Sequence, residues 1–438
     1  MFAIPLFLVA LQDAGPEQRF RLENGLAVVL RQIPEHEAVA VVVGYRAGTL
    51  DDPEGRRGLA HLVSHLARHA ALPSYAEDEA EKLLREEGFF RRPDTDSRAE
   101  TIQDLTYFQT LQPSRNLETV VRIESERMGR AEFSEALLED QRKEVLDEIR
   151  DSRADPIKTA YNALFAASYE RSPYRFPMAG LEEDVGSITL EEARLFHRAH
   201  YRPDRAVLVL YGALPENARG LVEKHFAGIP RGSEGLPEPA EEPEEAAGSR
   251  TVLRGAPGLA LLSFKSAAPG GAEKAAILLA VHEIRRRLEL HPGVASDTVE
   301  RSVSDDIRAR GRSLVICSLL LAPGGDAERV VAGVLEVLED VARLPPNEGR
   351  VRELAREVRA DLLADHALRP RTLARDRDGY LLRLGEAARD RMWAALAGED
   401  RVTNMADRVD QVTPEEIRAV LEKYFSKKRV NILIMRPE

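Results

Sequence analysis

The stretch Gly58-Leu59-Ala60-His61-Leu62-Val63-Ser64-His65-Leu66 sets two histidines four residues apart in an otherwise apolar run. Such a run predicts a helix, and on a helix residues four apart share one face. At a rise of about 1.5 Å per residue the two Cα atoms lie about 6 Å apart, so both imidazoles can reach one metal ion. The same spacing also fits partly buried histidines that bond to backbone groups or carboxylates. The pattern therefore predicts a helix and leaves two interpretations of its histidines.

The composition is that of an ordinary globular protein. The 438 residues, 43% of them hydrophobic, are enough for two or three domains with buried cores. The net charge of −12, with both signs spread along the chain, argues against a nucleic-acid partner, because such proteins gather Lys and Arg on one face. No apolar run approaches the roughly 20 residues that span a bilayer, so we expect no integral membrane segment. The single cysteine, Cys317, is expected to be a buried structural thiol.

Composition divides the chain into four parts. Residues 1–18 contain the apolar run Phe2–Leu11, which resembles the core of a secretory signal but has no Lys or Arg before it. We expect either an exported, periplasmic or secreted protein, or a cytoplasmic one in which this segment is an N-terminal arm. Residues 19–229 form the first predicted domain and residues 251–438 the second. Between them, residues 230–250 are rich in Pro, Glu, Gly and Ser, the composition of a solvated linker.

Strands and helices follow one another along the first domain. The pair Asn24-Gly25 between two apolar stretches predicts a tight hairpin, and residues 38–45 predict a third strand. Residues 99–112 carry several β-favouring side chains and predict a further strand. Residues 117–128 and 134–150 have the period of amphipathic helices. The pattern predicts an α+β fold.

The end of the first domain is repeated at the end of the chain. The segment that begins Ser187-Ile-Thr-Leu-Glu-Glu aligns without gaps on the segment that begins Gln411-Val-Thr-Pro-Glu-Glu, at a constant offset of 224 residues (411 − 187). A repeat of this kind indicates a duplicated unit. We therefore expect two homologous α+β domains of about 200 residues each.

Several short motifs follow one another along the chain. They are Leu22-Glu-Asn-Gly-Leu-Ala-Val-Val, Ala47-Gly48, Gly58-Leu-Ala-His61, His61-x-x-Ser64-His65, Ala99-x-Thr101, Asp104-x-Thr106-Tyr107, Arg142-x-x-Val145-x-x-Glu148, Pro177-x-x-Gly180 and Tyr201-x-Pro203. In this order they resemble the insulinase-type, pitrilysin-like zinc peptidases, which include the mitochondrial processing peptidases and the core subunits of the respiratory cytochrome bc complex. The resemblance covers nearly the whole first half and, more faintly, the second. It implies two homologous domains, each a mainly antiparallel sheet with helices packed on one face, as in one half of a clamshell.

The resemblance also implies a zinc site. His61 and His65 would be two ligands, and Glu148, on another helix, would be the third. In the family's motif His-x-x-Glu-His the glutamate acts as general base on the zinc-bound water, and Ser64 stands in its place here. Serine cannot remove that proton near neutral pH, and loss of a general base typically costs roughly 10² to 10⁴ in rate. Two imidazoles and a carboxylate are still sufficient ligands, so zinc binding stays open.

Other positions of the first half also depart from the family pattern. Arg98 stands where the family has an asparagine that holds the substrate backbone, next to Ala99 and Thr101 in the strand expected to bind substrate. Gln141 stands where the family has a second glutamate that supports the site, and Arg205 where an asparagine is usual. We expect the loss of the carboxylate at Gln141 to remove both negative charge and a group that orients a ligand.

In the second half the family pairs an arginine with a tyrosine to bind the substrate carbonyl. Arg308 is the expected arginine, but Leu314 occupies the place of the tyrosine. These two groups would stabilise the oxyanion that develops during cleavage, so this loss is separate from that of the general base. The two defects together predict a chain without peptidase activity.

Three functions fit these residues. The first is a non-catalytic homologue that forms a hetero- or homodimer with another insulinase-type subunit and binds an extended peptide or unfolded protein. The second is an active zinc metalloendopeptidase in which another carboxylate, such as Glu144 or Glu54, acts as the general base. The third is a structural scaffold subunit like the core proteins of the respiratory complex. We take the first as the prediction.

Overall fold

The computed structural model describes most of the chain. The described residues are 17–33, 37–92, 95–232, 235, 241–243, 248–267, 273–305, 310–364, 377–397 and 405–437. Most of the expected signal or arm, much of the expected linker, and Arg308 therefore lie outside the described residues.

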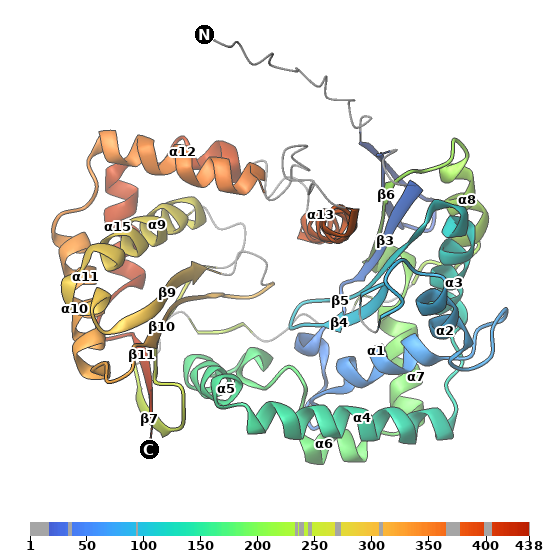
Figure 1. Ribbon diagram of the computed structural model, residues 1–438, viewed down its shortest axis with the longest axis horizontal. Helices are drawn as coiled ribbons and strands as arrows, with labels where there is room; N and C mark the ends of the chain where they lie inside the picture. The colour runs from blue at the N-terminus through green and yellow to red at the C-terminus, as the bar shows by residue number, and fades with distance from the viewer. Residues whose placement is uncertain are drawn as a thin grey trace, which may run out of the picture.

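Two β-sheets organise the described residues, one in each half of the chain (Figure 1). The first sheet has the strand order β1-β2-β6-β3-β5-β4 and the second the order β7-β11-β8-β10-β9. The first contains β1 (Gln18–Arg21), β2 (Ala27–Gln32), β3 (Ala38–Tyr45), β4 (Ser97–Thr101), β5 (Thr106–Pro113) and β6 (Ala206–Gly212). The second contains β7 (Arg250–Arg254), β8 (Leu259–Lys265), β9 (Thr298–Asp305), β10 (Leu314–Leu321) and β11 (Asn431–Arg436).

The helices of each half lie between and after these strands along the chain. Those of the first half are α1 (Leu59–His69), α2 (Glu79–Glu86), α3 (Leu117–Arg130), α4 (Glu135–Ala154), α5 (Pro156–Ser168), α6 (Glu182–Ser187), α7 (Leu190–His200) and α8 (Ala218–Phe226), with short 3₁₀ turns at η2 (Thr49–Asp51), η3 (Ser114–Asn116), η4 (Pro173–Arg175) and η5 (Pro203–Arg205). Those of the second half are α9 (Lys274–Leu290), α10 (Pro292–Ala295), α11 (Ala327–Arg343), α12 (Glu348–Ala364), α13 (Arg377–Ala397) and α15 (Pro414–Tyr424).

The two halves have the same topology. Apart from the additional edge strand β1, the order β2-β6-β3-β5-β4 matches β7-β11-β8-β10-β9 strand for strand. Each sheet has one parallel pair, β2 with β6 and β7 with β11, and its other pairs are antiparallel. The repeated segments also begin their helices alike, since Thr189 and Thr413 each form a capping box with a glutamate three residues later. The structure confirms two homologous α+β halves with mainly antiparallel sheets.

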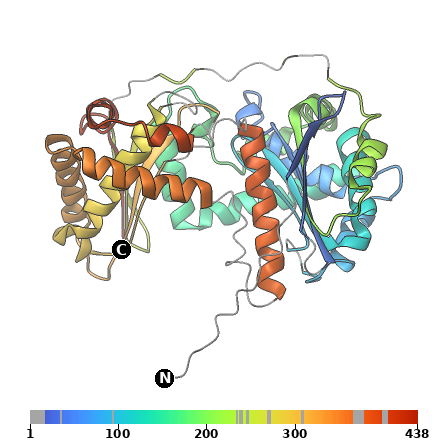
Figure 2. The same ribbon diagram turned by 90° about the horizontal axis from the view of Figure 1, so that it is seen from above.

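Each sheet is covered on one face by a helix from the other half. Helix α13 lies on β3 and β6 of the first sheet, where Leu384 and Met392 are buried with Val42 (Figures 1 and 2). Helix α5 lies on β8 and β11 of the second sheet through Ala160 and Leu164. Apart from α5 and α13, the described helices of each half pack on one face of its own sheet, as expected, and the helix exchanged from the other half covers the opposite face. The strand β3 is buried along its whole length, so both of its faces need an apolar cover.

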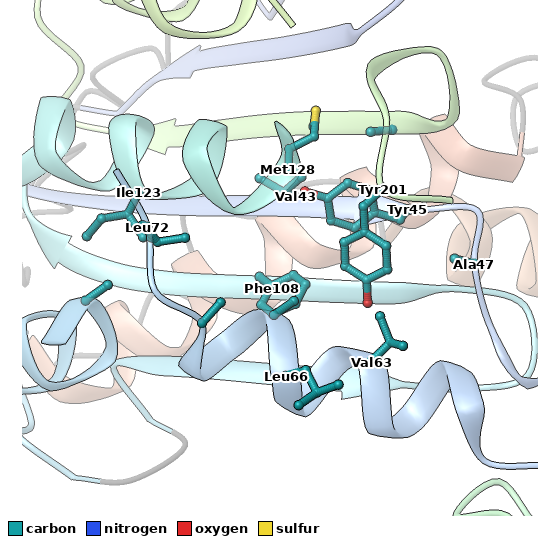
Figure 3. Packing of buried hydrophobic residues seen from close by; sticks show 14 of the residues in the cluster. Val43, Tyr45, Ala47, Val63, Leu66, Leu72, Phe108, Ile123, Met128 and Tyr201 are labelled. Atoms are coloured by element: carbon teal, nitrogen blue, oxygen red, sulfur yellow. The ribbon is translucent and has the colours of Figure 1, made fainter. Parts of the chain in front are cut away.

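The core of the first half centres on α1. Val63 and Leu66 on its inner face pack with Tyr45, Phe108 and Tyr201, and Figure 3 shows these rings between the strands and the helix. The rings of Tyr45 and Tyr201 stack with their centroids 4.4 Å apart. The tyrosine of the Tyr-x-Pro motif is thus part of the surface on which the two-histidine helix rests.

The strand expected over residues 99–112 is broken in two. It forms the edge strand β4 and its neighbour β5, which pair as an antiparallel hairpin. Between them the carbonyls of Ile102 and Gln103 accept hydrogen bonds from the backbone N–H groups of Thr49 and Leu50, at 3.1 and 2.9 Å. These bonds to another loop replace continued strand pairing, so the turn is set by a contact that is distant in the sequence.

Two expectations from the composition concern a membrane-spanning helix and the single cysteine. Within the described residues, no helix combines the length and apolar composition needed to cross a bilayer. Cys317 is free and buried in β10, as expected. Burial raises the pKa of its thiol to about 12, so it is not a reactive thiolate near neutral pH.

The exchanged helix α13 gives a test of how the two halves are joined. Replacing Leu384 by Ala removes a fully buried side chain, and we expect a loss of about 2 to 5 kcal/mol in the free energy of unfolding. Leu382→Ala on the same helix is the control, because Leu382 is 47% exposed, and it should change stability by about 0.5 kcal/mol or less. Guanidinium unfolding followed by circular dichroism measures both, and equal effects would contradict the packing of α13.

Candidate metal centre

The start of α1 is fixed by a buried carboxylate. Asp52 accepts hydrogen bonds from the backbone N–H groups of Gly58, at 2.8 Å, and Ala60, at 2.7 Å, through its two oxygens. Gly58 has a φ of +103°, and a Cβ there would lie 2.6 Å from the side chain of Val185. The position therefore requires glycine. This anchoring sets the rotation of α1 and with it the direction of its two histidines.

Helix α4 brings the acidic residue. Ser134 caps this helix by accepting from the backbone N–H of Leu137 at 3.0 Å. Val145 and Ile149 are buried against the core, which turns Glu148 toward α1 at the surface of the molecule. The guanidinium of Arg142 donates to the carbonyl of Val185 at 2.6 Å and so holds the helix in place. In the Arg-x-x-Val-x-x-Glu motif the arginine therefore anchors the helix, and the glutamate is the side chain that reaches the candidate site.

The three expected ligands lie together. The Nε2 atom of His61 is 3.3 Å from Oε2 of Glu148, and the Nε2 atom of His65 is 3.7 Å from Oε1 of the same carboxylate. The two imidazole rings are nearly perpendicular, with centroids 4.8 Å apart. One ligand atom from each of the three residues lies within 4.8 Å of the others, and the described part of the chain contains no second group of three His, Cys, Asp or Glu side chains with this geometry.

Electrostatics favour the forms that bind metal. Burial and the neighbouring His61 lower the pKa of His65 to about 4, so this ring is neutral near neutral pH. The hydrogen bond from His61 holds the pKa of Glu148 below its ordinary value, against the effect of its partial burial. A neutral imidazole and an ionised carboxylate are the protonation states that zinc requires.

Gln141 orients His65. Its Oε1 atom lies 3.2 Å from Nδ1 of His65, so the Nδ1–H group donates to it and Nε2 keeps a lone pair that faces Glu148. The expectation that Gln141 removes ligand orientation was therefore wrong, because an amide oxygen accepts this hydrogen bond as a carboxylate would. The missing negative charge is the remaining difference. Sequence reasoning missed this contact, since it joins residues 76 positions apart.

Ser64 does not face the ligands. Its side chain is buried, with 2% of the residue exposed, and its hydroxyl donates to the backbone carbonyl of His61 at 2.7 Å. The hydroxyl is therefore held against its own helix. It cannot act on a water molecule bound between the histidines and Glu148.

The other candidate side chains lie elsewhere. His69, the next histidine on α1, has its Nδ1 atom 2.7 Å from Oδ1 of Asp78 and is outside the ligand group. Glu144 and Glu54 are exposed, and neither belongs to the ligand group found among the described residues.

The expected substrate strand is the edge strand β4, which packs beside α1. Arg98 forms an ion pair with Glu100, and Glu100 also accepts a hydrogen bond from the hydroxyl of Tyr107. Ala99 and Thr101 are partly buried, and Thr101 bonds to Thr106 across the hairpin at 3.0 Å. The guanidinium of Arg98 is thus engaged on the strand itself, where the family has a free amide for the substrate.

The second half reaches the first through Arg310. Its guanidinium forms an ion pair with Asp51 at 2.6 Å, and its backbone N–H donates to Asp104 at 2.8 Å. Leu314, in the place of the expected tyrosine, is 3% exposed and packs with Tyr169 and other residues of the first half. Arg308 lies outside the described residues. Among the described residues, packing and ion pairs hold this junction together. Within this described part of the chain it presents no open pair of groups that could bind an oxyanion.

The donor set fits zinc. Zinc–nitrogen and zinc–oxygen bonds of about 2.0–2.2 Å in a tetrahedral centre separate the ligand atoms by about 3.3–3.6 Å. The separations of 3.3 and 3.7 Å from Glu148 to the two imidazoles match this range closely. The lone pair of His65 Nε2 also faces a carboxylate oxygen 3.7 Å away, a separation that a shared cation would bridge. Two imidazoles and one carboxylate leave the fourth position open to water.

Sequence comparison places these residues among known proteins. Residues 27–180 match the family profile described as insulinase (peptidase family M16), and residues 187–358 match that described as peptidase M16 inactive domain. The zinc protease PqqE of Helicobacter pylori is 27% identical over 237 residues, which are 53% of this chain and 52% of that protein. The match thus spans about half of that relative. An uncharacterized zinc protease of Mycobacterium leprae is 23% identical over 435 residues, covering 94% of this chain and 89% of that protein.

Structural comparison gives the same fold. The crystal structure of a protease from Helicobacter pylori superposes with a TM-score of 0.80 over 96% of this chain and 100% of that one, at 18% sequence identity. At this identity the likeness concerns the fold alone.

Metal binding tests the ligand set directly. His61→Ala and Glu148→Gln each remove a ligand, so we expect both variants to lose the zinc that the wild-type chain takes up, as measured by calorimetric titration with zinc. His69→Ala is the matched control on the same helix, because its ring bonds to Asp78 and not to the ligand group. Equal zinc affinity in all four proteins would contradict the site.

A second prediction concerns Gln141. Glutamate at this position would accept the same hydrogen bond from His65 and add a negative charge, so Gln141→Glu should tighten zinc binding by roughly 10- to 100-fold. Gln141→Ala removes the acceptor and should weaken zinc binding by a similar factor. The titration is the same, and an unchanged affinity in Gln141→Ala would show that the amide does not orient the ligand.

Proposed function

Because the chain belongs to the insulinase family of peptidases, peptidase family M16, we propose that it is a non-catalytic member that binds extended peptides as the partner subunit of an active zinc peptidase. The observation that carries this proposal is the hydroxyl of Ser64, which is buried and donates to the carbonyl of His61 at 2.7 Å. The position that should supply the general base thus offers no proton acceptor to the ligand group.

The ligand residues support retention of the metal. His61, His65 and Glu148 would hold zinc, and zinc, when bound, polarises a carbonyl and acidifies water. Without a base beside it, that acidified water has no group to take its proton and pass it to the leaving amine. The metal would then serve structure and peptide binding.

The second half supports the same conclusion. Leu314 cannot donate to a developing oxyanion, and it is buried in the contact with the first half. Tyr174 lies in the same cluster, but its hydroxyl donates to Asp104 and accepts from the backbone N–H of Arg310 at 3.0 Å. The hydroxyl of Tyr174 is therefore already engaged on both sides.

The edge strand β4 supports peptide binding. It closes one side of the first sheet, and its outer edge carries backbone groups that an extended peptide can pair with as an added strand. Since β4 packs beside α1, such a peptide would pass the metal centre. A non-catalytic chain that holds a peptide in this way supplies half of a binding chamber to an active homologue.

Activity of the purified chain tests the proposal. We expect the zinc-loaded protein to bind a fluorescent unstructured peptide, measured by anisotropy, and to leave it uncleaved, measured by mass spectrometry. Cleavage that is abolished by a chelator and by His61→Ala would contradict the proposal and favour the active peptidase, with Glu144→Gln as the next variant. Absence of peptide binding would favour the scaffold subunit.

The replacement Ser64→Glu tests the cause of inactivity. The carboxylate would restore a proton acceptor, and we expect zinc-dependent cleavage to rise by roughly 10² to 10⁴ over the wild type. Ser64→Gln, which has the same size without the basic group, is the control. If Ser64→Glu binds zinc and stays inactive, the missing base is not the only defect, and the losses in the second half are implicated as well.

A further inference from the structure

Three consecutive backbone N–H groups converge on one carboxylate at the junction of the two halves. The N–H groups of Glu170 and Arg171 donate to Glu242 at 2.8 and 2.9 Å, and that of Ser172 donates at 2.7 Å. The ammonium group of Lys265 adds a fourth bond at 2.7 Å. We call these four donors the carboxylate cradle.

The four donors of the cradle are divided equally between the two oxygens of the carboxylate. Oε1 of Glu242 accepts from Glu170 and Lys265, and Oε2 accepts from Arg171 and Ser172. A run of backbone N–H groups of this kind forms a concave site with partial positive charge, and the lysine adds a full charge. Although burial opposes ionisation, the bonds from the backbone and from Lys265 hold the pKa of Glu242 below its ordinary value.

The donors belong to rigid parts of the fold. Residues 170–172 follow the exchanged helix α5, and the hydroxyl of Tyr169 donates to the carbonyl of Arg312 at 2.8 Å. Lys265 ends β8, and its ammonium also donates to the carbonyl of Pro243 at 3.0 Å. The cradle therefore joins an element of the first half to an element of the second and takes its ligand from the segment that connects them.

The deep burial of Glu242 is unusual for its position in the chain. Glu242 is only 5% exposed, whereas the neighbouring Glu241 is exposed, although both lie in a run that is rich in Glu and Pro. Without a carboxylate the three N–H groups and Lys265 would lack these partners, and an unsatisfied buried donor costs about 1–3 kcal/mol. The bonds described at the cradle go to a carboxylate and to one backbone carbonyl, groups that another peptide also carries.

We propose that the backbone of residues 170–172 and Lys265 form a binding site for acidic peptides, which Glu242 fills from within the chain and which accepts the glutamate of another peptide in its place. The recognised unit is a glutamate followed by a residue whose backbone carbonyl accepts a second bond, because Lys265 bonds both to the carboxylate of Glu242 and to the carbonyl of Pro243. An attached ligand has a high effective concentration, so a free peptide binds once Glu242 is removed or released. This site is separate from the metal ligands and does not depend on whether the chain cleaves peptides.

Hydrogen exchange on the full-length protein tests this site. We expect Glu242→Ala to raise the exchange rate of the amides of residues 170–172 by roughly tenfold or more, because they lose their acceptor. Glu241→Ala, one residue away and exposed, is the matched control and should leave these rates unchanged. Unchanged exchange in Glu242→Ala would overturn the cradle. Should that variant lose its cooperative thermal transition, Glu242→Gln keeps the size of the side chain but replaces one acceptor oxygen by a donor, so faster exchange is expected only for the amides that lose their acceptor.

Rescue by an added peptide tests the ligand class. Acetyl-Glu-Pro-amide should restore the protection of residues 170–172 in Glu242→Ala, whereas acetyl-Gln-Pro-amide at the same concentration should not. The double variant Glu242→Ala, Lys265→Ala should lose most of the rescue. Equal effects of the two peptides, or rescue by sodium chloride at the same ionic strength, would show a general salt effect and overturn the proposal.

Discussion

The two central sheets have apolar residues on both faces, and among the described residues neither half has a helix of its own on the second face. Helix α13 covers the first sheet and α5 covers the second, so each core contains side chains from the other half. This exchange couples the halves more firmly than a surface contact would, because separating them would expose buried Leu384 and Leu164 at the same time. The Arg310 junction and the carboxylate cradle, which each join residues of the two halves, depend on this arrangement.

The duplication shows what became of the metal site in the second half. Helix α9 contacts β9 and α12 as α1 contacts β4 and α4. Where α1 and α4 bring together two histidines and Glu148, α9 and α12 bring together Glu283 and Arg350, which form a largely buried ion pair at 3.0 Å. Helices α1 and α4 thus hold a ligand group that is open on one side. Between α9 and α12, in contrast, the charges of Glu283 and Arg350 are paired with each other.

The first-half site has three side chains arranged as metal ligands but a serine at the position expected to supply the general base. Gln141 still orients His65 at 3.2 Å, and Glu148 still faces both imidazoles. Ser64, in contrast, has turned its hydroxyl to the helix backbone. Metal binding needs only donors at the right separations, whereas proton transfer needs a basic atom beside the bound water, so the two properties can be lost separately.

The sequence by itself determined the local structure and the identity of the key residues. The Asn24-Gly25 turn, the shared face of His61 and His65, and the repeat at an offset of 224 residues all follow from periods and turn residues that act over a few positions. Only the tertiary structure decided which helix covers which sheet, that the strand expected at residues 99–112 breaks, and that Gln141 and Glu242 find their partners. The physical reason is that an apolar pattern specifies that a face is buried but not what buries it. A hydrogen bond between distant residues forms only after packing has brought its donor and acceptor together.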